Sequence, residues 1–160
     1  KINKKKFLNY DIFKEKKDFN YYKKFTKFAF IGVGQIFSPM IRKKLFNKLT
    51  KKKFKMPKII SKKSIVSKLA KIDDGTVIMH GVKINSGVKI GKNCIINSGA
   101  IIEHGTVIGD NCHISTGAIL NGNVIIGNDT FIGSGSILRE EINIKKNSFI
   151  KMGSILKKDQ

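Results

Sequence analysis

The stretch that decides the fold is CIINSGAIIEHGTVIGDNCHISTGAILNGN, residues 94–123, which divides without insertion into segments of six residues. Each segment begins with a small residue, has Ile or Leu in third place and ends in Gly or Asn. The same division extends outward over residues 64–159, and the third place is Val, Ile or Leu throughout. A helix turns by about 100° per residue, so residues six apart face different directions, and the pattern excludes an amphipathic helix.

The six-residue period has a direct structural interpretation. Alternating apolar and variable residues form short strands with one buried face. Gly and Asn tolerate positive φ, which allows the chain to turn a corner after every strand. The sequence therefore predicts a stacked, parallel β-solenoid over this region. Cys94 and Cys112 fall in the small interior place, where stacking could bring them within disulfide range; free cysteines in the core are the favoured interpretation.

The composition is strongly basic, with 32 Lys and Arg against 11 Asp and Glu and a net charge of +21. Most of the excess lies in residues 1–63, in runs such as Lys51-Lys52-Lys53. Such runs suit nucleic acid, an anionic membrane or phosphorylated small substrates. We favour a general bias toward Lys, Ile and Asn, without a specific nucleic-acid partner. No segment is long enough to span a membrane, and neither a signal peptide nor a disulfide framework is evident, so a cytoplasmic protein is expected.

The front of the chain follows a different pattern. Residues 21–35 are predicted to form a strand that runs into a glycine-containing turn. Ile41, Leu45, Phe46 and Leu49 recur at helical spacing, and residues 58–60 are a further strand candidate. These elements predict a β-α-β fragment that is too small for a complete nucleotide-binding domain.

Four quoted segments carry a resemblance to a known family: FAFIGVGQ at residues 28–35, IRKKLFNKL at 41–49, the EH pair with His113 nine residues after His104, and the NG that follows at 121–122. Over residues 25–158 the chain resembles the sugar acetyltransferases of the NeuD/PglD type. Family members begin with a Rossmann-like domain that carries a glycine-rich loop, and they end in a Gly-x-Pro-Ala tail. Neither motif is found here, and GVGQ corresponds to a later loop, so a chain shortened at both ends is expected.

The resemblance implies a left-handed parallel β-helix in which three hexads form one triangular coil of 18 residues. We therefore expect about five coils, with residues 18 apart stacked in columns. One column comprises Ile72, Ile90, Ile108, Ile126 and Ile144; another comprises Ile78, Ile96, Ile114, Ile132 and Ile150. The predicted organisation is a partial α/β, Rossmann-like region for nucleotide-sugar binding at residues 1–60 and the β-helix acetyltransferase domain at 61–160.

The resemblance also implies an enzyme that transfers an acetyl group from acetyl-CoA to an amino sugar. The expected acceptor is a UDP-linked 4-amino-sugar of bacterial surface glycan synthesis, and O-acetylation of a sialic-acid-like sugar is the alternative. His104 would be the general base, because an imidazole is well suited to proton transfer near neutral pH. Glu103 and Asp110 are the candidates for the carboxylate that orients its ring, because the family's usual carboxylate position is Gly105 here.

The remaining site residues are likewise implied by the family. His113 would contact the acetyl donor, the backbone of Gly122 would hold the thioester carbonyl, and Ser134 and Gly153 are further coenzyme A candidates. Gly32, Gly34 and Gln35 are the substrate-binding candidates of the front region. Nine residues are half a coil, so His104 and His113 should lie on opposite sides of one prism. They can share a site only in the homotrimer that is usual for the fold, with active sites between subunits.

Two other functions are weighed against this one. A metal-dependent hydratase of the γ-carbonic anhydrase type has the same fold, but it needs three histidine ligands, two of them five residues apart. His80, His104 and His113 do not have this spacing, so no metal is expected and His80 is interpreted as a surface residue. The second alternative is a non-catalytic trimeric scaffold that binds a partner through its basic front.

Overall fold

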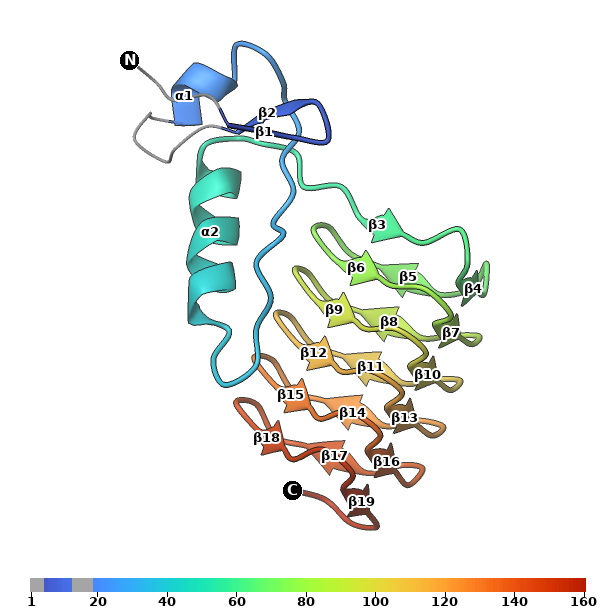
Figure 1. Ribbon diagram of the computed structural model, residues 1–160. Helices are drawn as coiled ribbons and strands as arrows, with labels where there is room; N and C mark the ends of the chain where they lie inside the picture. Colours follow the sequence, from blue (N-terminus) through green and yellow to red (C-terminus); the bar gives the residue numbers. More distant parts are fainter. Residues whose placement is uncertain (1–4, 13–18) are drawn as a thin grey trace.

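The computed structural model describes residues 5–12 and 19–160, and its main body is a left-handed parallel β-helix of about five coils (Figure 1). A front region precedes it. There a short hairpin of β1 (Lys5–Phe7) and β2 (Tyr10–Ile12) comes before α1 (Phe19–Tyr22), and α2 (Met40–Lys51) lies beside the β-helix. Residues 1–4 and 13–18, which include parts of the predicted 1–60 region, lie outside the described residues.

The β-helix has three parallel sheets, because each coil adds one two-residue strand to each side of the prism. The first sheet contains β3 (Ile59–Ile60), β6 (Val77–Ile78), β9 (Ile95–Ile96), β12 (His113–Ile114), β15 (Phe131–Ile132) and β18 (Phe149–Ile150). The second contains β4 (Ile65–Val66), β7 (Lys83–Ile84), β10 (Ile101–Ile102), β13 (Ile119–Leu120), β16 (Ile137–Leu138) and β19 (Ile155–Leu156). The third contains β5 (Lys71–Ile72), β8 (Lys89–Ile90), β11 (Val107–Ile108), β14 (Ile125–Ile126) and β17 (Asn143–Ile144).

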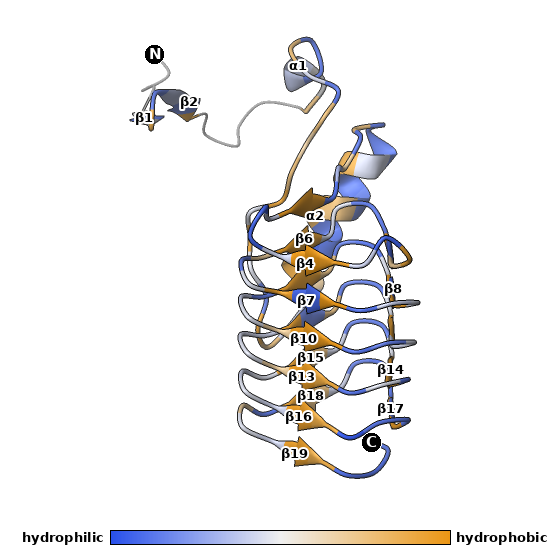
Figure 2. Cartoon of the chain, turned by 90° about the vertical axis from the view of Figure 1, so that its right-hand side faces the viewer, coloured by the Kyte–Doolittle hydropathy of each residue, from blue (hydrophilic) through white to orange (hydrophobic). Residues whose placement is uncertain are grey.

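The register of the sheets confirms the 18-residue coil. Ile90 pairs with Ile72 and Ile108, and Ile114 pairs with Ile96 and Ile132, so both predicted columns are present. The third place of each hexad points inward, and Ile96, Ile102 and Ile114 are fully buried. Each buried side chain of this size stabilises the fold by about 1.5–3 kcal/mol. In Figure 2 the strands are the most hydrophobic parts of each coil, and the corners range from hydrophilic to intermediate.

The corners have the conformation that the sixth place of the hexads predicts. Gly105 has a φ of 69°, and Asn93 and Asn111 have φ values of 57° and 56°. Asp129 and Glu141 also adopt positive φ in this place, at 62° and 64°, although they are neither Gly nor Asn. Leu69, in the same place of the first hexad, does not adopt it, so the corner permits this conformation in residues other than Gly and Asn without imposing it at every coil.

Cys94 and Cys112 are free, buried core residues, and the favoured interpretation is confirmed. Each thiol lies 3.0–3.2 Å from a backbone carbonyl oxygen of the following coil, that of Gly109 for Cys94 and that of Gly127 for Cys112. Burial raises the pKa of the Cys94 thiol well above its usual value, so this thiol stays protonated.

The front region covers the first sheet with two elements. An extended segment, residues 28–38, runs alongside the coils and is here called the strap; α2 then runs back along it (Figure 1). Ile31 of the strap packs with Leu49 of α2 and with Phe54 and Met56 in a second apolar cluster. The predicted helix through Ile41 and Leu49 and the short strand at residues 59–60 are both confirmed.

The strand predicted over residues 21–35 is wrong. Its first residues belong to α1, and the strap makes one isolated bridge, from Phe28 to Lys55. A strand needs a neighbour along its whole length, and within residues 5–12 and 19–160 this segment has one only at Lys55. Farther along, the carbonyls of Ile31 and Val33 accept hydrogen bonds from the guanidinium of Arg42 instead of from a strand. Among the described helices, none combines the length and apolarity needed to cross a membrane.

Candidate active site

His104 lies at the corner between the second and third sheets, in the turn from β10 to β11, where its ring is exposed. The ring lies over Gly122 of the next coil. A Cβ atom added to Gly122 would be 2.7 Å from Cε1 and 2.8 Å from Nε2 of His104. Only glycine therefore leaves room for the imidazole in this position.

The carboxylate of Glu103 is engaged with the preceding coil. One of its oxygens accepts a hydrogen bond of 2.5 Å from Nδ2 of Asn85. Asp110 lies at the next corner, between the third and first sheets, where Oδ1 accepts from the backbone N–H of Lys92 at 2.7 Å. Within the described part of the chain, neither carboxylate is hydrogen-bonded to the His104 ring.

The backbone of Gly122 offers a hydrogen-bond donor beside His104. Its carbonyl accepts from the N–H of Glu141 at 2.9 Å, which ties this corner to the next coil. In residues 5–12 and 19–160 the Gly122 N–H has no hydrogen-bond acceptor. An unpaired backbone N–H at an open corner is the type of group that stabilises a developing oxyanion.

His113 lies on β12, on the first sheet, and the strap covers it. Its Nδ1 is 2.5 Å from the backbone oxygen of Gln35, and its Nε2 is 3.3 Å from Nδ2 of Asn97. The ring also meets Phe131 edge to face, with centroids 5.2 Å apart. Burial lowers the pKa of His113 below its ordinary value, which favours the neutral ring.

The strap residues predicted to bind substrate lie beside His113. A cavity of about 280 Å³ separates the strap from the first sheet, and its lining includes Gly32, Gly34, Asn97 and His113. Gln35 is buried, and its side-chain amide donates a 2.7 Å hydrogen bond to the backbone oxygen of Asn111. Its side chain therefore binds the β-helix.

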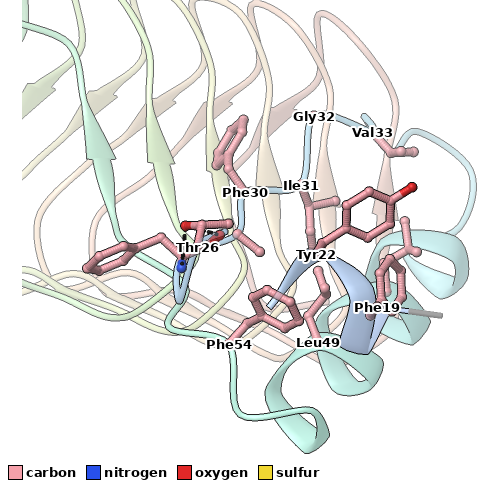
Figure 3. A pocket seen from close by; sticks show the side chains of 12 residues that line it. Phe19, Tyr22, Thr26, Phe30, Ile31, Gly32, Val33, Leu49 and Phe54 are labelled. Carbon is pink, nitrogen blue, oxygen red and sulfur yellow. Dashed lines mark hydrogen bonds between the residues drawn. The ribbon is translucent and has the colours of Figure 1, made fainter. Parts of the chain in front are cut away.

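A second cavity lies on the outer side of the strap (Figure 3). It has a volume of about 380 Å³ and is enclosed by α1, the strap, α2 and Phe54. Gly32 and Val33 line both cavities, so this part of the strap is a thin wall between them. The outer cavity is mainly aromatic and aliphatic, as the side chains of Phe19, Phe30 and Leu49 show in Figure 3.

Ser134 and Gly153 lie together at the corner between the first and second sheets. The N–H of Gly153 donates to the backbone oxygen of Ser134 at 2.9 Å, and the Ser134 hydroxyl is 2.9 Å from that of Ser115. His80 occupies the same corner nearer the N-terminus, where Nδ1 is 2.7 Å from the Ser61 hydroxyl.

The predicted residues thus form two separate groups within one chain. Glu103, His104 and Gly122 lie at the corner of the second and third sheets. The others, Gly32, Gly34, Gln35, His113, Ser134 and Gly153, lie on the first sheet or at its border with the second. In a triangular prism a corner is opposite the remaining face, so the two histidines of one chain face away from each other.

Sequence reasoning missed the residues that attach the strap to the β-helix, above all Arg42. A usable signal was present: Arg42 is three residues before Leu45 and seven before Leu49, on the apolar side of α2. A charge on that side of a helix indicates a buried polar contact. Among the described residues, no group of three or more His, Cys, Asp or Glu side chains is placed to hold a metal ion.

Comparison with known families identifies the repeats. Residues 69–104 and 105–140 match the bacterial transferase hexapeptide family (six repeats), and residues 123–158 match the hexapeptide repeat of succinyl-transferase. The repeat region of the chain therefore consists of hexapeptide repeats of the kind found in bacterial transferases. Comparison with the curated proteins finds no match.

Comparison with solved structures shows similarity to sugar acetyltransferases in particular. The chain is similar to PerB from Caulobacter crescentus in complex with CoA and GDP-perosamine, with 26% identity and a TM-score of 0.83 over 88% of this chain and 66% of that one. A histidine-to-asparagine mutant of that perosamine N-acetyltransferase, also with CoA and GDP-perosamine, gives 25% identity and a TM-score of 0.83, and 88% of this chain covers 65% of its length. The acetyltransferase domain of PglB from Neisseria gonorrhoeae FA1090 gives 27% identity, a TM-score of 0.76 and coverages of 78% and 60%.

These similarities confirm the predicted resemblance to the sugar acetyltransferases of the NeuD/PglD type. The chain spans about two thirds of the length of the perosamine N-acetyltransferase. The activity of that enzyme is therefore applied to this chain only as a proposal.

Proposed function

We propose that this chain catalyses acetyl transfer from acetyl-CoA to the amine of a nucleotide-linked amino sugar. The observation that carries the proposal is the position of His104, an exposed imidazole that lies over a glycine at an open corner. The similarity to an N-acetyltransferase that binds CoA and GDP-perosamine supports this substrate class. We keep a UDP-linked 4-amino-sugar as the predicted acceptor, with a GDP-linked one as the alternative that the similar enzyme suggests.

The proposed reaction needs one base and one oxyanion donor. His104 accepts a proton from the sugar amine as its nitrogen attacks the thioester carbonyl carbon. The carbonyl oxygen becomes an oxyanion, for which the Gly122 N–H is the candidate donor. The carbon–sulfur bond then breaks, and the proton held by His104 passes to the departing sulfur, which leaves as free coenzyme A. A placed base of this kind contributes roughly 10²–10⁴ in rate.

The second group of residues can reach this site only from another copy of the chain. We propose a homotrimer in which His113 of one subunit, with Ser134 and Gly153, faces the His104 corner of its neighbour. An apolar stripe along the outer face of the second sheet supports such assembly. Its members are 18 residues apart, and Lys83 interrupts them after the first: Ile65, Ile101, Ile119, Ile137 and Ile155.

The stripe is unusual for a surface that faces water. Ile65 and Ile155 are 68% and 66% exposed, and Ile137 is 37% exposed. In Figure 2, where this sheet faces the viewer, its strands are hydrophobic except at β7. An apolar face of this kind is typical of a protein interface, and the sheet that carries it borders the corner of His104. The location of the protein in the cell stays a prediction, and we expect the cytoplasm.

The test is a thiol-release assay with acetyl-CoA and a panel of acceptors: UDP- and GDP-linked 4-amino-sugars and sialic-acid-like sugars. His104→Ala should lower the rate by about 10²-fold or more, whereas the control His80→Ala should not change it. Activity that stays within about threefold of wild type in His104→Ala would refute the base assignment. Transfer only to sialic-acid-like acceptors would favour the O-acetyltransferase. Absence of saturable acetyl-CoA binding in calorimetry would contradict the transferase and favour the scaffold alternative.

Mixed trimers test the shared site separately. Subunits with His104→Ala and subunits with His113→Ala should each be inactive, and co-refolded mixtures should regain activity because some interfaces then carry both native histidines. Mixtures that regain none, although mixed trimers form, contradict the shared site.

A further inference from the structure

Arg42 is the largest polar side chain in the interior, and it fastens the strap to the β-helix. It is only 1% exposed. On the strap side, Nη1 donates to the carbonyl oxygens of Ile31 at 2.6 Å and Val33 at 3.0 Å. On the β-helix side, Nη2 donates to the carbonyl of Gly75 at 3.2 Å and Nε to that of Asn93 at 3.3 Å. One planar guanidinium therefore fixes the distance between two segments of the backbone.

Two residues after Val33 on the strap, Gln35 makes two further contacts with the β-helix. Its side-chain Nε2 donates to the backbone oxygen of Asn111 at 2.7 Å. Its own backbone oxygen lies 2.5 Å from Nδ1 of His113. A carbonyl oxygen can only accept a hydrogen bond, so Nδ1 of His113 must carry the proton.

The contact at the opposite edge of the His113 ring, with Asn97, independently indicates the same tautomer. The Oδ1 atom of Asn97 accepts from the backbone N–H of Ser98 at 2.8 Å, which directs its Nδ2 donors away from that contact. Nδ2 lies 3.3 Å from Nε2 of His113. An amide nitrogen can only donate, so Nε2 must be the unprotonated atom. Both edges of the ring therefore require the same neutral tautomer.

We propose that Arg42 and Gln35 are positioning residues of the transferase site, which hold His113 in the Nδ1–H tautomer so that Nε2 is a hydrogen-bond acceptor. The inference rests on the proposed function. It assigns the chemistry of the group that meets His113: Nδ2 of Asn97 now lies 3.3 Å from Nε2, and a ligand group that replaces it there must itself be an N–H or O–H donor, which a thioester carbonyl is not. Such donors are present in the amides of the pantetheine arm and in the amine and hydroxyls of a sugar.

The burial of the charged Arg42 side chain, which is unfavourable for folding, agrees with a positioning role. Burial lowers the pKa of its guanidinium, and no carboxylate within the described residues is paired with it. A buried charge that binds only backbone carbonyls stabilises a fold no better than a well-packed apolar side chain would. What it adds is geometry, because an apolar side chain cannot fix four carbonyl oxygens at defined positions.

The test is ¹⁵N NMR of histidine-labelled full-length chain, in which protonated and bare ring nitrogens give distinct shifts. The sequence has three histidines, so His80→Gln and His104→Gln spectra assign the signals of His113. Wild type should show a protonated Nδ1 and a bare Nε2. Arg42→Lys keeps the charge but loses the planar fork, and Gln35→Met keeps the volume but loses the donor to Asn111. Both variants should weaken the tautomer preference and shift the ring signals toward a mixture, because the Gln35 carbonyl is then less well placed and only Asn97 still favours Nδ1–H; the control Lys44→Met, on the same helix, should leave the signals unchanged.

Kinetics then separate the two sources of the donor group. Weakening one hydrogen bond should raise a KM by about three- to tenfold in both variants. A rise in KM for acetyl-CoA assigns the pantetheine arm, and a rise in KM for the sugar assigns the acceptor. Gln35→Met replaces a side chain whose buried Oε1 has no hydrogen-bond partner among the described residues, so it should fold even if Arg42→Lys does not.

The two proposals fail in different ways. A wild-type His113 protonated at Nε2, or a tautomer that neither variant changes, overturns the positioning role whatever the enzyme does. Absence of acetyl transfer in wild type overturns the proposed function, and the spectra still report the tautomer.

Discussion

Substitution of Gly122 by alanine tests the candidate active site at its tightest point. The added Cβ would lie 2.7 Å from Cε1 and 2.8 Å from Nε2 of His104, where ordinary contacts are 3.4–4 Å. The ring must therefore move by about 1 Å, and a displacement of this size costs on the order of 10²-fold in rate, or about 2.7 kcal/mol of activation free energy. The backbone of Gly122 is not in the left-handed region, and His104 is exposed, so the fold itself should tolerate the methyl group.

The assay compares kcat for acetyl transfer with the midpoint of thermal unfolding. Gly122→Ala should lose about 10²-fold in kcat with an unfolding midpoint close to that of wild type. The control is Ser86→Thr, which adds one methyl group at the same corner, one coil before His104. A folded Gly122→Ala variant with kcat within about threefold of wild type would mean that the ring position over Gly122 is not the productive one.

Three further substitutions test other parts of the structure. Because burial lowers the pKa of His113, the unfolded chain binds a proton before the folded chain as the pH falls below the ordinary value of about 6.5. Urea titrations should show stability falling below this pH by at most about 1.4 kcal/mol per pH unit from this group, and His113→Gln should remove that part of the slope while His80→Gln does not. Ile137→Lys in the apolar stripe should reduce the mass of the assembly in sedimentation, whereas Ile125→Lys on the outer face of the third sheet should not. Gly133→Ala should lower the free energy of unfolding by about 1–3 kcal/mol, because its Cβ would meet the backbone of the next coil.

The β-helix could be predicted from the sequence because every coil repeats the same local rule. The columns through Ile90 and Ile114 follow from counting residues in steps of 18, and each hexad needs only its neighbours above and below. The corner at His104 could be predicted for the same reason, since Gly122 is one coil farther along. A repeat turns sequence separation directly into position, and no long-range contact needs to be guessed.

The front region lacks such a rule, and there the prediction fails. The contacts that place the strap join Arg42 to a carbonyl 51 residues away and Gln35 to His113, 78 residues away. Each is a single polar contact between segments without a shared period. A lone strand also resembles a strap in sequence, because both are extended and apolar on one side. They differ in the group that hydrogen-bonds to the backbone, which for a strand is another strand and for the strap is the Arg42 side chain on α2.

The prism geometry decides what the two histidines can do. His104 is at a corner and His113 is on the opposite face, so one chain cannot bring both to the same substrate. The apolar stripe lies on the outer face of the second sheet, which borders the His104 corner, so a neighbouring subunit packed on the stripe would meet this corner. His113 is covered by its own strap and fixed as an acceptor, so it would enter that neighbour's site already oriented. A site divided in this way places the proton-accepting base on one subunit and a preset acceptor on another, and its assembly depends on the outer isoleucines as much as on either histidine.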